Sequence, residues 1–144
     1  MPGTFDLERF LPYQLNVLAG RLSRGLAERY RRAWGITIPQ WRVVAHLSQS
    51  EAVSVREIHE KVDMDKSKVS RAASRLEQSG YITKRSNPND RRLVELALTD
   101  KGREMMADLA PLALEYEQQV LARLDPALTA ALRDAIDELL EENE

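Results

Sequence analysis

The stretch MDKSKVSRAASRLEQSGYITKRSNPNDRRLVELALTDKG, residues 64–102, contains a helical pattern followed by a change to strand periodicity. Asp65 is a favourable N-cap for a helix that carries Val69, Ala73 and Leu76 on one face, and Gly80 suits the position just after its end. Residues 81–86 and 93–99 have strand composition, and in the second segment Val94, Leu96 and Leu98 fall on one side of a half-buried strand. The NPND sequence between them is typical of a turn. The stretch therefore predicts a helix followed by a β-hairpin.

The charge of this region differs from that of the whole 144-residue chain, whose formal net charge is −2. Residues 66–92 contain eight basic side chains and two acidic ones, whereas residues 93–144 contain four basic and thirteen acidic ones. A local excess of positive charge in an acidic chain indicates contact with a polyanion, and it implies a different role for the acidic part. The alternative is that both regions are solvated surface.

Helices are expected before this stretch. Pro12 is a favoured first-turn residue for a helix that repeats apolar side chains at spacings of three and four and ends at Gly35. Thr37 followed by Gln40 fits a capping box, which predicts the start of a second helix.

A short third helix and two later ones complete the helical pattern. Ser54 followed by Glu57 is another capping box. After the hairpin, Thr99 can cap a helix that runs to about residue 123, and Pro111 is expected to kink it. Residues 125–126 begin a last helix with apolar side chains on one face.

These elements predict a mainly α-helical protein with a small β-hairpin. Two short helices, a tight turn and a hairpin are the outline of a winged helix-turn-helix, expected here in residues 36–99. Residues 1–35 and 100–144 would form flanking N- and C-terminal helices with more apolar surface than that domain needs. They could fold back on the domain, but we expect them to form a dimer interface.

The helix after Asp65 presents polar and basic side chains opposite its apolar face. Arg and Lys reach guanine acceptors or phosphates, Gln pairs with adenine, and Ser fits close to a base edge. Residues near the N-terminus of such a helix usually read bases in the major groove, whereas the later ones touch the DNA backbone. An ordinary solvated helix is the alternative. The candidate DNA-binding residues are Lys66, Ser67, Lys68, Ser70, Arg71, Ser74, Arg75 and Gln78.

The hairpin tip is a second candidate contact. Arg91 and Arg92 can extend from the turn, and a narrow minor groove attracts an inserted Arg. Asp90 would be unfavourable beside phosphates unless it braces a neighbouring guanidinium through a bidentate pair. The alternative is that residues 87–92 form only a soluble turn.

The segments ITIPQWRVVAHL and SVREIHEKVDMDKSKVSRAASRLEQSGYITKRSNPNDRRLVELALTDKG resemble the MarR family of bacterial transcriptional regulators. The most specific element is the wing sequence that begins at Asn87, where the family often has Asp. The resemblance implies a homodimer built from the terminal helices and a recognition helix in the major groove. It also implies that Arg92 enters the minor groove with support from Asp90, and that Asn87 and Arg91 belong to the same DNA-binding wing.

Family members of this kind often release DNA when a small aromatic acid or phenol binds between the dimer helices and the winged domain. The resemblance therefore implies a transcription regulator, expected to be a repressor, with a small aromatic effector as a further partner. Packing is the alternative role for the aromatic residues. The candidate lining residues are Tyr13, Trp34, Trp41, Arg42 and His46.

Composition argues against other functions. The chain has no cysteine, and no apolar run is long enough for a membrane span or a signal peptide, so we expect a soluble, cytoplasmic protein without membrane partners. Two histidines and the lack of a Gly-rich phosphate loop disfavour an enzyme, and we expect no cofactor. A metal sensor using His46 and His59 with Glu57 and Glu60, and an adaptor that binds proteins through a winged fold, are the remaining alternatives.

Overall fold

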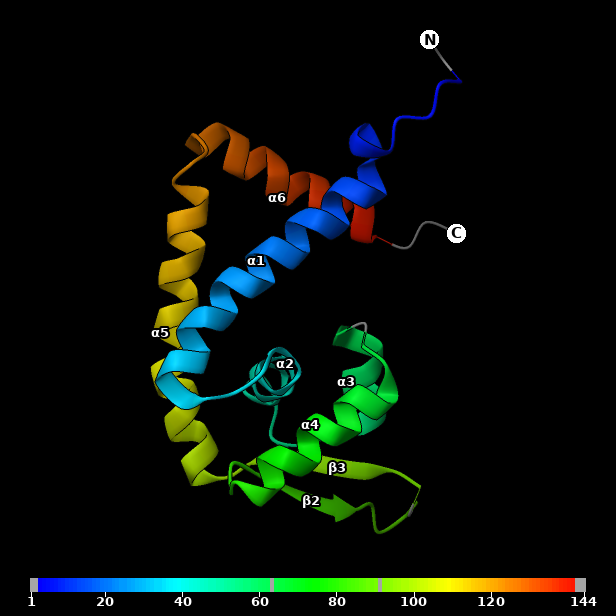
Figure 1. The fold of residues 1–144 in the computed structure, drawn as a ribbon. Coiled ribbons are helices and arrows are strands. Elements are labelled where there is room, and N and C mark those ends of the chain that lie inside the picture. Colours follow the sequence, from blue (N-terminus) through cyan, green and yellow to red (C-terminus); the bar gives the residue numbers. More distant parts are fainter. Residues whose placement is uncertain (1–2, 63, 91, 142–144) are drawn as a thin grey trace. The chain divides into compact units, whose positions relative to one another are not determined.

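The computed structural model describes residues 3–62, 64–90 and 92–141, which divide into two compact units at Pro111. The helices and strands follow the order expected from the sequence (Figure 1). Their bounds are η1 Leu7–Arg9, α1 Leu11–Trp34, α2 Ile38–Leu47, β1 Val53–Ser54, α3 Val55–Val62, α4 Lys66–Gln78, β2 Ile82–Ser86, β3 Val94–Leu98, α5 Asp100–Leu121 and α6 Pro126–Leu140.

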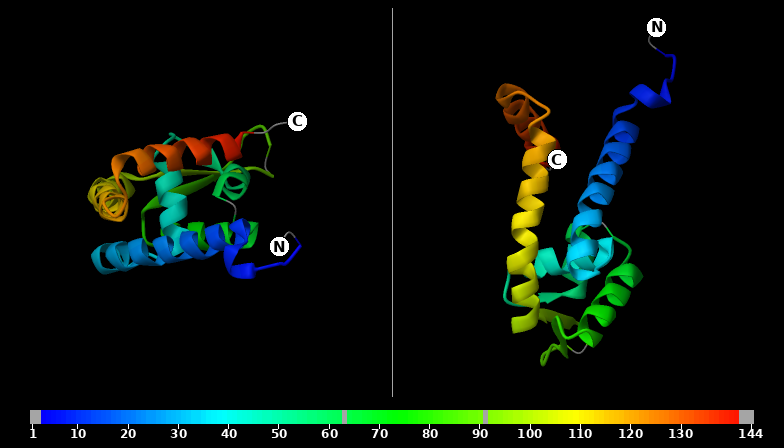
Figure 2. Two further views of the ribbon diagram at one scale, coloured as in Figure 1. Left: turned by 90° about the horizontal axis from the view of Figure 1, so that it is seen from above. Right: turned by 60° about the vertical axis from the view of Figure 1, so that its left-hand side comes forward.

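The predicted hairpin is part of an antiparallel sheet with strand order β1-β3-β2. Lys84 of β2 pairs with Leu96 of β3, and Leu96 also pairs with Val53 of β1. The sequence did not indicate β1, because two residues are too few to show strand periodicity. Figures 1 and 2 show α4 and the hairpin together at the end of the first unit that lies away from the start of α1.

The core of the first unit lies among α2, α3, α4 and the sheet. Val43, Val44, Ile58, Val69 and Leu96 have almost no exposed surface, and Val69, Ala73 and Leu76 form the predicted inner face of α4. Burying such side chains stabilises the fold by roughly 1.5–3 kcal/mol each. The core therefore fixes the position of α4 relative to the hairpin.

Capping hydrogen bonds mark the starts of α2 and α3, and glycines follow the ends of α1 and α4, at the positions predicted from the sequence. Thr37 and Gln40 form a reciprocal capping box at the start of α2. Ser54 accepts a hydrogen bond of 3.1 Å from the Glu57 backbone at the start of α3. Gly35 and Gly80 adopt φ values of 69° and 84° after α1 and α4, a region that disfavours other residues.

The end of α4 is joined to the start of α5 by a compact set of contacts. The Thr99 hydroxyl donates a 2.6 Å hydrogen bond to the Gly80 carbonyl and accepts one of 3.1 Å from the Gly102 backbone. Lys101 donates to the Ser79 carbonyl at 2.8 Å. Gly102 is buried so close to the Tyr81 carbonyl that a Cβ atom would lie 2.1 Å from that oxygen. The helix start therefore requires glycine at this position.

The second unit contains the later part of α5 and all of α6. Pro111 lies inside α5, which continues without a break to Leu121. Asp125 caps α6 by accepting a 3.1 Å hydrogen bond from the Leu128 backbone, and Arg133 pairs with Glu117 at 3.5 Å. Along the described ranges, no helix is both long enough and apolar enough to cross a membrane.

Candidate nucleic-acid interface

α4 is held at its N-terminus by the predicted cap. Asp65 accepts hydrogen bonds from the Ser67 backbone at 2.9 Å and from the Ser67 hydroxyl at 3.0 Å. These bonds favour the carboxylate and lower the pKa of Asp65 below its usual value. A charged cap also interacts favourably with the positive end of the helix, so the first turn is ordered before any ligand binds.

The predicted DNA-binding residues of α4 are exposed with one exception. Ser74 is half-buried and accepts a 2.7 Å hydrogen bond from the Lys84 ammonium group on β2. Lys84 also lies 4.0 Å from Glu77. Ser74 therefore joins α4 to the hairpin, a role that the helical pattern did not indicate because Lys84 is far away in sequence. The exposed candidates are Lys66, Ser67, Lys68, Ser70, Arg71, Arg75 and Gln78.

Asn87 organises the wing turn. Its side-chain oxygen accepts hydrogen bonds from the backbones of Asn89 at 2.8 Å and Asp90 at 3.3 Å, and its amide nitrogen donates to Glu95 at 3.1 Å. These contacts use the side chain within the turn. Asn87 therefore holds the wing turn in shape, a role that its prediction as a DNA-binding residue did not include.

Asp90 and Arg92 form the bidentate pair that the sequence suggested. The Arg92 Nε donates to Asp90 Oδ1 at 3.1 Å, and Nη2 donates to Oδ2 at 3.3 Å. The Arg92 side chain is nevertheless 90 % exposed. Hydrogen bonds from the side chain and backbone of Arg92 lower the pKa of Asp90, so the carboxylate is charged at neutral pH. Arg91, the other predicted wing contact, lies outside the described residues.

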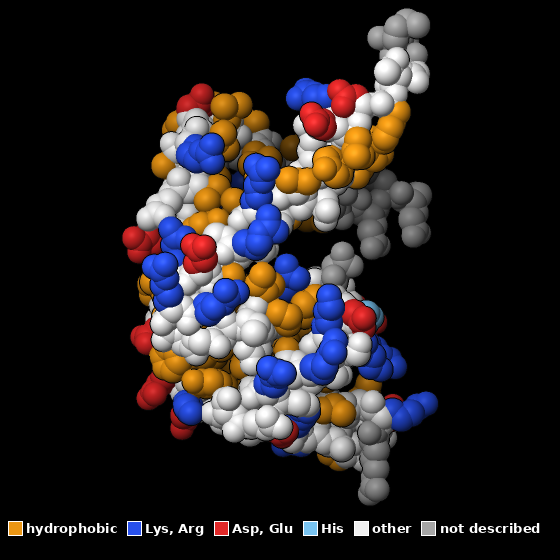
Figure 3. Space-filling model, viewed as in Figure 1, with side chains coloured by type: hydrophobic (Ala, Val, Ile, Leu, Met, Phe, Trp, Pro, Cys, Tyr) orange, Lys and Arg blue, Asp and Glu red, His pale blue; other side chains and the backbone are white. Residues whose placement is uncertain are grey.

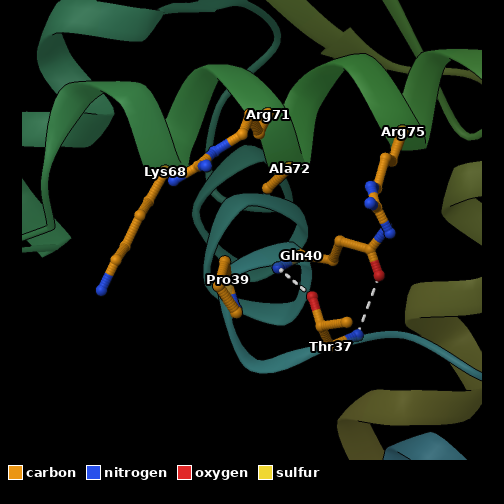
Figure 4. A pocket seen from close by; sticks show the side chains of 7 residues that line it. All are labelled: Thr37, Pro39, Gln40, Lys68, Arg71, Ala72 and Arg75. Carbon is orange, nitrogen blue, oxygen red and sulfur yellow. Dashed lines mark hydrogen bonds between the residues drawn. The ribbon is translucent and has the colours of Figure 1, made fainter.

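Basic side chains follow α4 on the face seen in Figure 3. On the wing side, a hollow of about 250 Å³ is lined by Lys66, Ser70 and Arg92, together with Arg56 of α3. On the α2 side, a second hollow of about 400 Å³ is lined by Lys68, Arg71 and Arg75 (Figure 4). The exposed face of α4 is thus bordered by two cationic depressions.

Sequence reasoning missed Arg56 as a member of this surface. The one signal in the sequence was its position. Arg56 is a basic residue in the first turn of α3, the helix that precedes α4. Its charge also helps to lower the pKa of Asp90, after the larger effect of the Arg92 hydrogen bonds. Arg56 therefore adds positive charge next to the wing.

The five candidate effector residues have different surroundings. Arg42 lines a hollow of about 410 Å³, together with residues of α1 and the start of α4. Trp34 packs edge-on against Tyr81, and Trp41 stacks on Tyr30 with 5.5 Å between ring centroids. Tyr13 is exposed on α1, and His46 is half-buried in the last turn of α2. Both tryptophans thus pack against other aromatic rings of the first unit.

The histidines have separate surroundings. His59, in the last turn of α3, makes a hydrogen bond to the Met64 carbonyl just before α4. Within the described part of the chain, no group of three His, Cys, Asp or Glu side chains could hold a metal ion.

Comparison with known proteins identifies the relatives of this chain. The sequence model of the MarR family matches residues 36–94. The organic hydroperoxide resistance transcriptional regulator of Bacillus subtilis is 30 % identical over 105 residues, which cover 71 % of each protein. The chain belongs to the MarR family. The MarR relatives are transcriptional regulators rather than enzymes, as the sequence predicted.

Similarity to other MarR proteins extends over different lengths. The chain is 29 % identical to the HTH-type transcriptional regulator BilQ of Clostridioides difficile over 65 % of its own length, and it spans 63 % of that relative.

Solved MarR structures share the winged-helix fold. Sco3205 of Streptomyces coelicolor, solved in complex with DNA, has a TM-score of 0.82 and 24 % identity, covering 96 % of this chain and 89 % of that one. BpsR of Bordetella bronchiseptica, whose DNA binding is regulated by 6-hydroxynicotinic acid, has a TM-score of 0.82 and 20 % identity, covering 98 % and 100 %.

Proposed function

We propose that this MarR protein is a sequence-specific, DNA-binding transcriptional regulator that represses its target genes as a homodimer. The observation that carries the proposal is the Asp90–Arg92 pair, which orients a 90 % exposed guanidinium at the tip of the wing beside cationic α4. A soluble turn needs no such brace. An arginine that enters a minor groove gains from it, because less side-chain freedom is lost on binding.

The two DNA-contacting parts suit adjacent grooves. α4 would lie in the major groove, with Ser67, Lys68, Ser70 and Arg71 in its first half near base edges or phosphates. Arg92 would enter the neighbouring minor groove. A dimer would present each part twice and bind a pseudo-palindrome with half-sites about one helical turn apart.

Exposed apolar side chains support the homodimer. Phe10, Leu11, Leu15 and Leu18 are each at least 46 % exposed near the start of α1. α6 likewise exposes Leu128, Leu132 and Ile136 at intervals of four residues. Helices with an uncovered apolar face are typical of interfaces. We therefore assign residues 1–35 and 100–144 to dimerisation and residues 36–99 to DNA binding.

A small aromatic or phenolic effector would relieve repression. The hollow beside Arg42 offers Arg24, Arg42 and Lys68 for a carboxylate or a phenolate, and the regulation of BpsR by 6-hydroxynicotinic acid is a precedent in a protein of the same fold. A ligand that binds better when the recognition helices are misplaced shifts the population away from the DNA-binding state. Release of bound DNA on adding such an acid tests this part.

Arg92→Ala tests the central proposal. Gel-shift titrations with the DNA upstream of the protein's own gene should show at least tenfold weaker binding, since both wings of the dimer lose their minor-groove contact. The Arg123→Ala variant is a matched control, because it removes the same charge from an exposed residue after α5. It should bind like the parent protein.

Circular dichroism and gel filtration should show that Arg92→Ala remains folded and dimeric. Equal affinity of Arg92→Ala and the parent would contradict the role of the wing. Failure of the parent protein to bind any duplex at low salt would contradict DNA binding altogether and would favour an adaptor function.

A further inference from the structure

The hollow between α2 and α4 has an unusual set of lining groups. It measures about 400 Å³ and is bordered by Thr37 and Gln40 from the start of α2 and by Lys68, Arg71 and Arg75 from α4. None of its lining residues is acidic. Three cations that face one depression without a carboxylate repel one another, and an anion placed there would remove that repulsion.

Gln40 adds an amide donor to this hollow. Its side-chain Oε1 accepts a 2.8 Å hydrogen bond from the Thr37 backbone N–H, and the Gln40 backbone N–H donates to Thr37 Oγ1 at 3.3 Å. A backbone N–H requires an acceptor, so the capping box fixes which amide atom is oxygen and which is nitrogen.

The Gln40 amide nitrogen is consequently directed into the hollow. Figure 4 shows this nitrogen on the side of the Arg75 guanidinium, away from Thr37. Gln40 is only 9 % exposed, and no hydrogen bond from this nitrogen is found among the described residues. The nitrogen itself is not fully buried, so it meets solvent where it faces the hollow. Its two N–H groups are therefore available to an acceptor that enters the hollow, while the rest of the side chain is held by packing and by the cap.

Two neighbouring donors of this kind fit an oxygen of an anion. The Arg75 guanidinium supplies charge and directional N–H groups, and the Gln40 amide supplies N–H groups that the capping box has already oriented. The start of α2 adds a partial positive charge. A phosphate with several exposed oxygens satisfies both side chains at once.

The position of the hollow indicates the source of that phosphate. α4 is bordered by this hollow on the α2 side and by the hollow of Lys66, Arg56 and Arg92 on the wing side. A major groove is likewise bordered by two sugar–phosphate backbones. Because the hollow opens beside the exposed face of α4, a helix seated in the groove would bring one backbone to each depression.

From these observations we propose that Gln40 and Arg75 together hold a backbone phosphate of the DNA strand that borders the major groove on the α2 side. The inference rests on the proposed DNA-binding function and adds Gln40, a residue of α2, to the candidate contacts on α4 and the wing. Gln40 acts as a fixed, neutral phosphate donor. It sets how deeply α4 enters the groove, because its amide cannot move without breaking the cap of α2.

Gln40→Glu tests the role of the amide nitrogen without removing the cap. Glutamate keeps an oxygen for the Thr37 backbone and is equally suited to this position of a capping box. It replaces the N–H groups with a second oxygen that faces Arg75 and repels phosphate. The matched control is Gln49→Glu, the same change at an exposed glutamine just after α2.

The measurements are affinities for two duplexes, the upstream operator DNA and a random sequence, between about 50 and 200 mM salt. A lost phosphate contact weakens binding uniformly across sequences and lowers the salt slope. We expect Gln40→Glu to bind both duplexes at least tenfold more weakly, with a slope reduced by about 1–2 per dimer. Gln49→Glu should match the parent protein, and all three should unfold at similar temperatures.

Arg75→Ala tests whether Gln40 and Arg75 hold the same phosphate. Alone it should lower affinity for both duplexes, and combining it with Gln40→Glu should add little, because the two changes remove the same contact. Fully additive losses would show that Gln40 and Arg75 hold different groups and would overturn the shared site.

The remaining outcomes separate the inference from the function on which it rests. If the parent protein binds DNA and Gln40→Glu binds equally with an unchanged salt slope, the phosphate role of Gln40 is wrong, while the regulator function stands. If inorganic phosphate raises the unfolding temperature of the parent but not of Gln40→Glu, and their DNA affinities are equal, the hollow binds a free anion and the assignment to DNA is wrong. Absence of DNA binding by the parent contradicts the function itself.

Discussion

At the scale of single residues, the wing carries an acidic residue, Asp90, although a negative charge is unfavourable on a surface that would contact DNA. Asp90 would repel the phosphates of bound DNA, yet it restrains the Nε and Nη2 groups of Arg92 in one orientation. The two effects act differently on DNA. Repulsion lowers affinity for every sequence, whereas orientation helps only where a minor groove accepts the arginine.

Asp90→Asn separates these effects. The variant removes a negative charge, so affinity for random DNA should stay equal or rise, while operator affinity should fall about two- to tenfold per wing because Arg92 is no longer immobilised. Competition titrations of operator against random duplex measure the ratio. An unchanged ratio would show that Asp90 does not orient Arg92 for a specific site.

The lowered pKa of Asp90 also predicts how the wing responds to pH: the specificity lost in Asp90→Asn should be lost in the parent protein only in strong acid. The Arg92 hydrogen bonds lower the pKa of Asp90, so the pair is intact above the ordinary carboxyl pKa of about 3.9 and is lost only as pH falls below it. Wing geometry should therefore be independent of pH throughout the neutral range.

At the scale of elements, the junction between α4 and α5 is fixed by close packing at one glycine. Any Cβ at Gly102 would lie 2.1 Å from the Tyr81 carbonyl and 3.1 Å from a Leu98 methyl group. The carbonyl belongs to the backbone and cannot rotate away, so α5 would have to move from its position after β3.

Gly102→Ala should therefore destabilise the protein by about 1–3 kcal/mol, the usual effect of overpacking. The control is Gly20→Ala in α1, where the added Cβ would meet only the flexible end of the Arg24 side chain at 3.2 Å. Alanine in a helix is favoured over glycine by roughly 1 kcal/mol, so this variant should be neutral or more stable. Thermal unfolding compares the two, and equal behaviour would show that α5 adjusts freely.

The sequence predicted the elements that depend on local chemistry. Asp65, Thr37 and Gly80 mark helix ends through contacts within a few residues, and each lies where its cap or turn requires. The pairing of Ser74 with Lys84 and the close approach of Gly102 to Tyr81 join residues that are distant in sequence, so no local pattern revealed them. The sequence identified Gln40 as part of a helix cap. It did not show that the amide nitrogen of Gln40 faces α4, because that depends on how α2 and α4 pack together.

At the scale of the whole molecule, the terminal helices leave several large apolar side chains exposed, which makes them candidate interfaces. Leu128, Leu132 and Ile136 lie on one face of α6, with exposed fractions of 54 %, 40 % and 45 %. DNA binding would depend on covering them, because a monomer contributes one recognition helix and one wing, whereas a dimer contributes two of each.

Leu132→Glu combined with Ile136→Glu should convert the proposed dimer into a monomer, because two charges per subunit would be buried in an apolar interface. Ala130→Glu is the matched control, since it adds a charge to an exposed position on the opposite side of α6. Light scattering should show the change in mass. Gel shifts should then show weak binding with about half the salt slope, because the monomer contacts half as many phosphates. If the double variant remained dimeric, α6 would not belong to the interface. If it were a monomer with full operator affinity, DNA binding would not require a dimer.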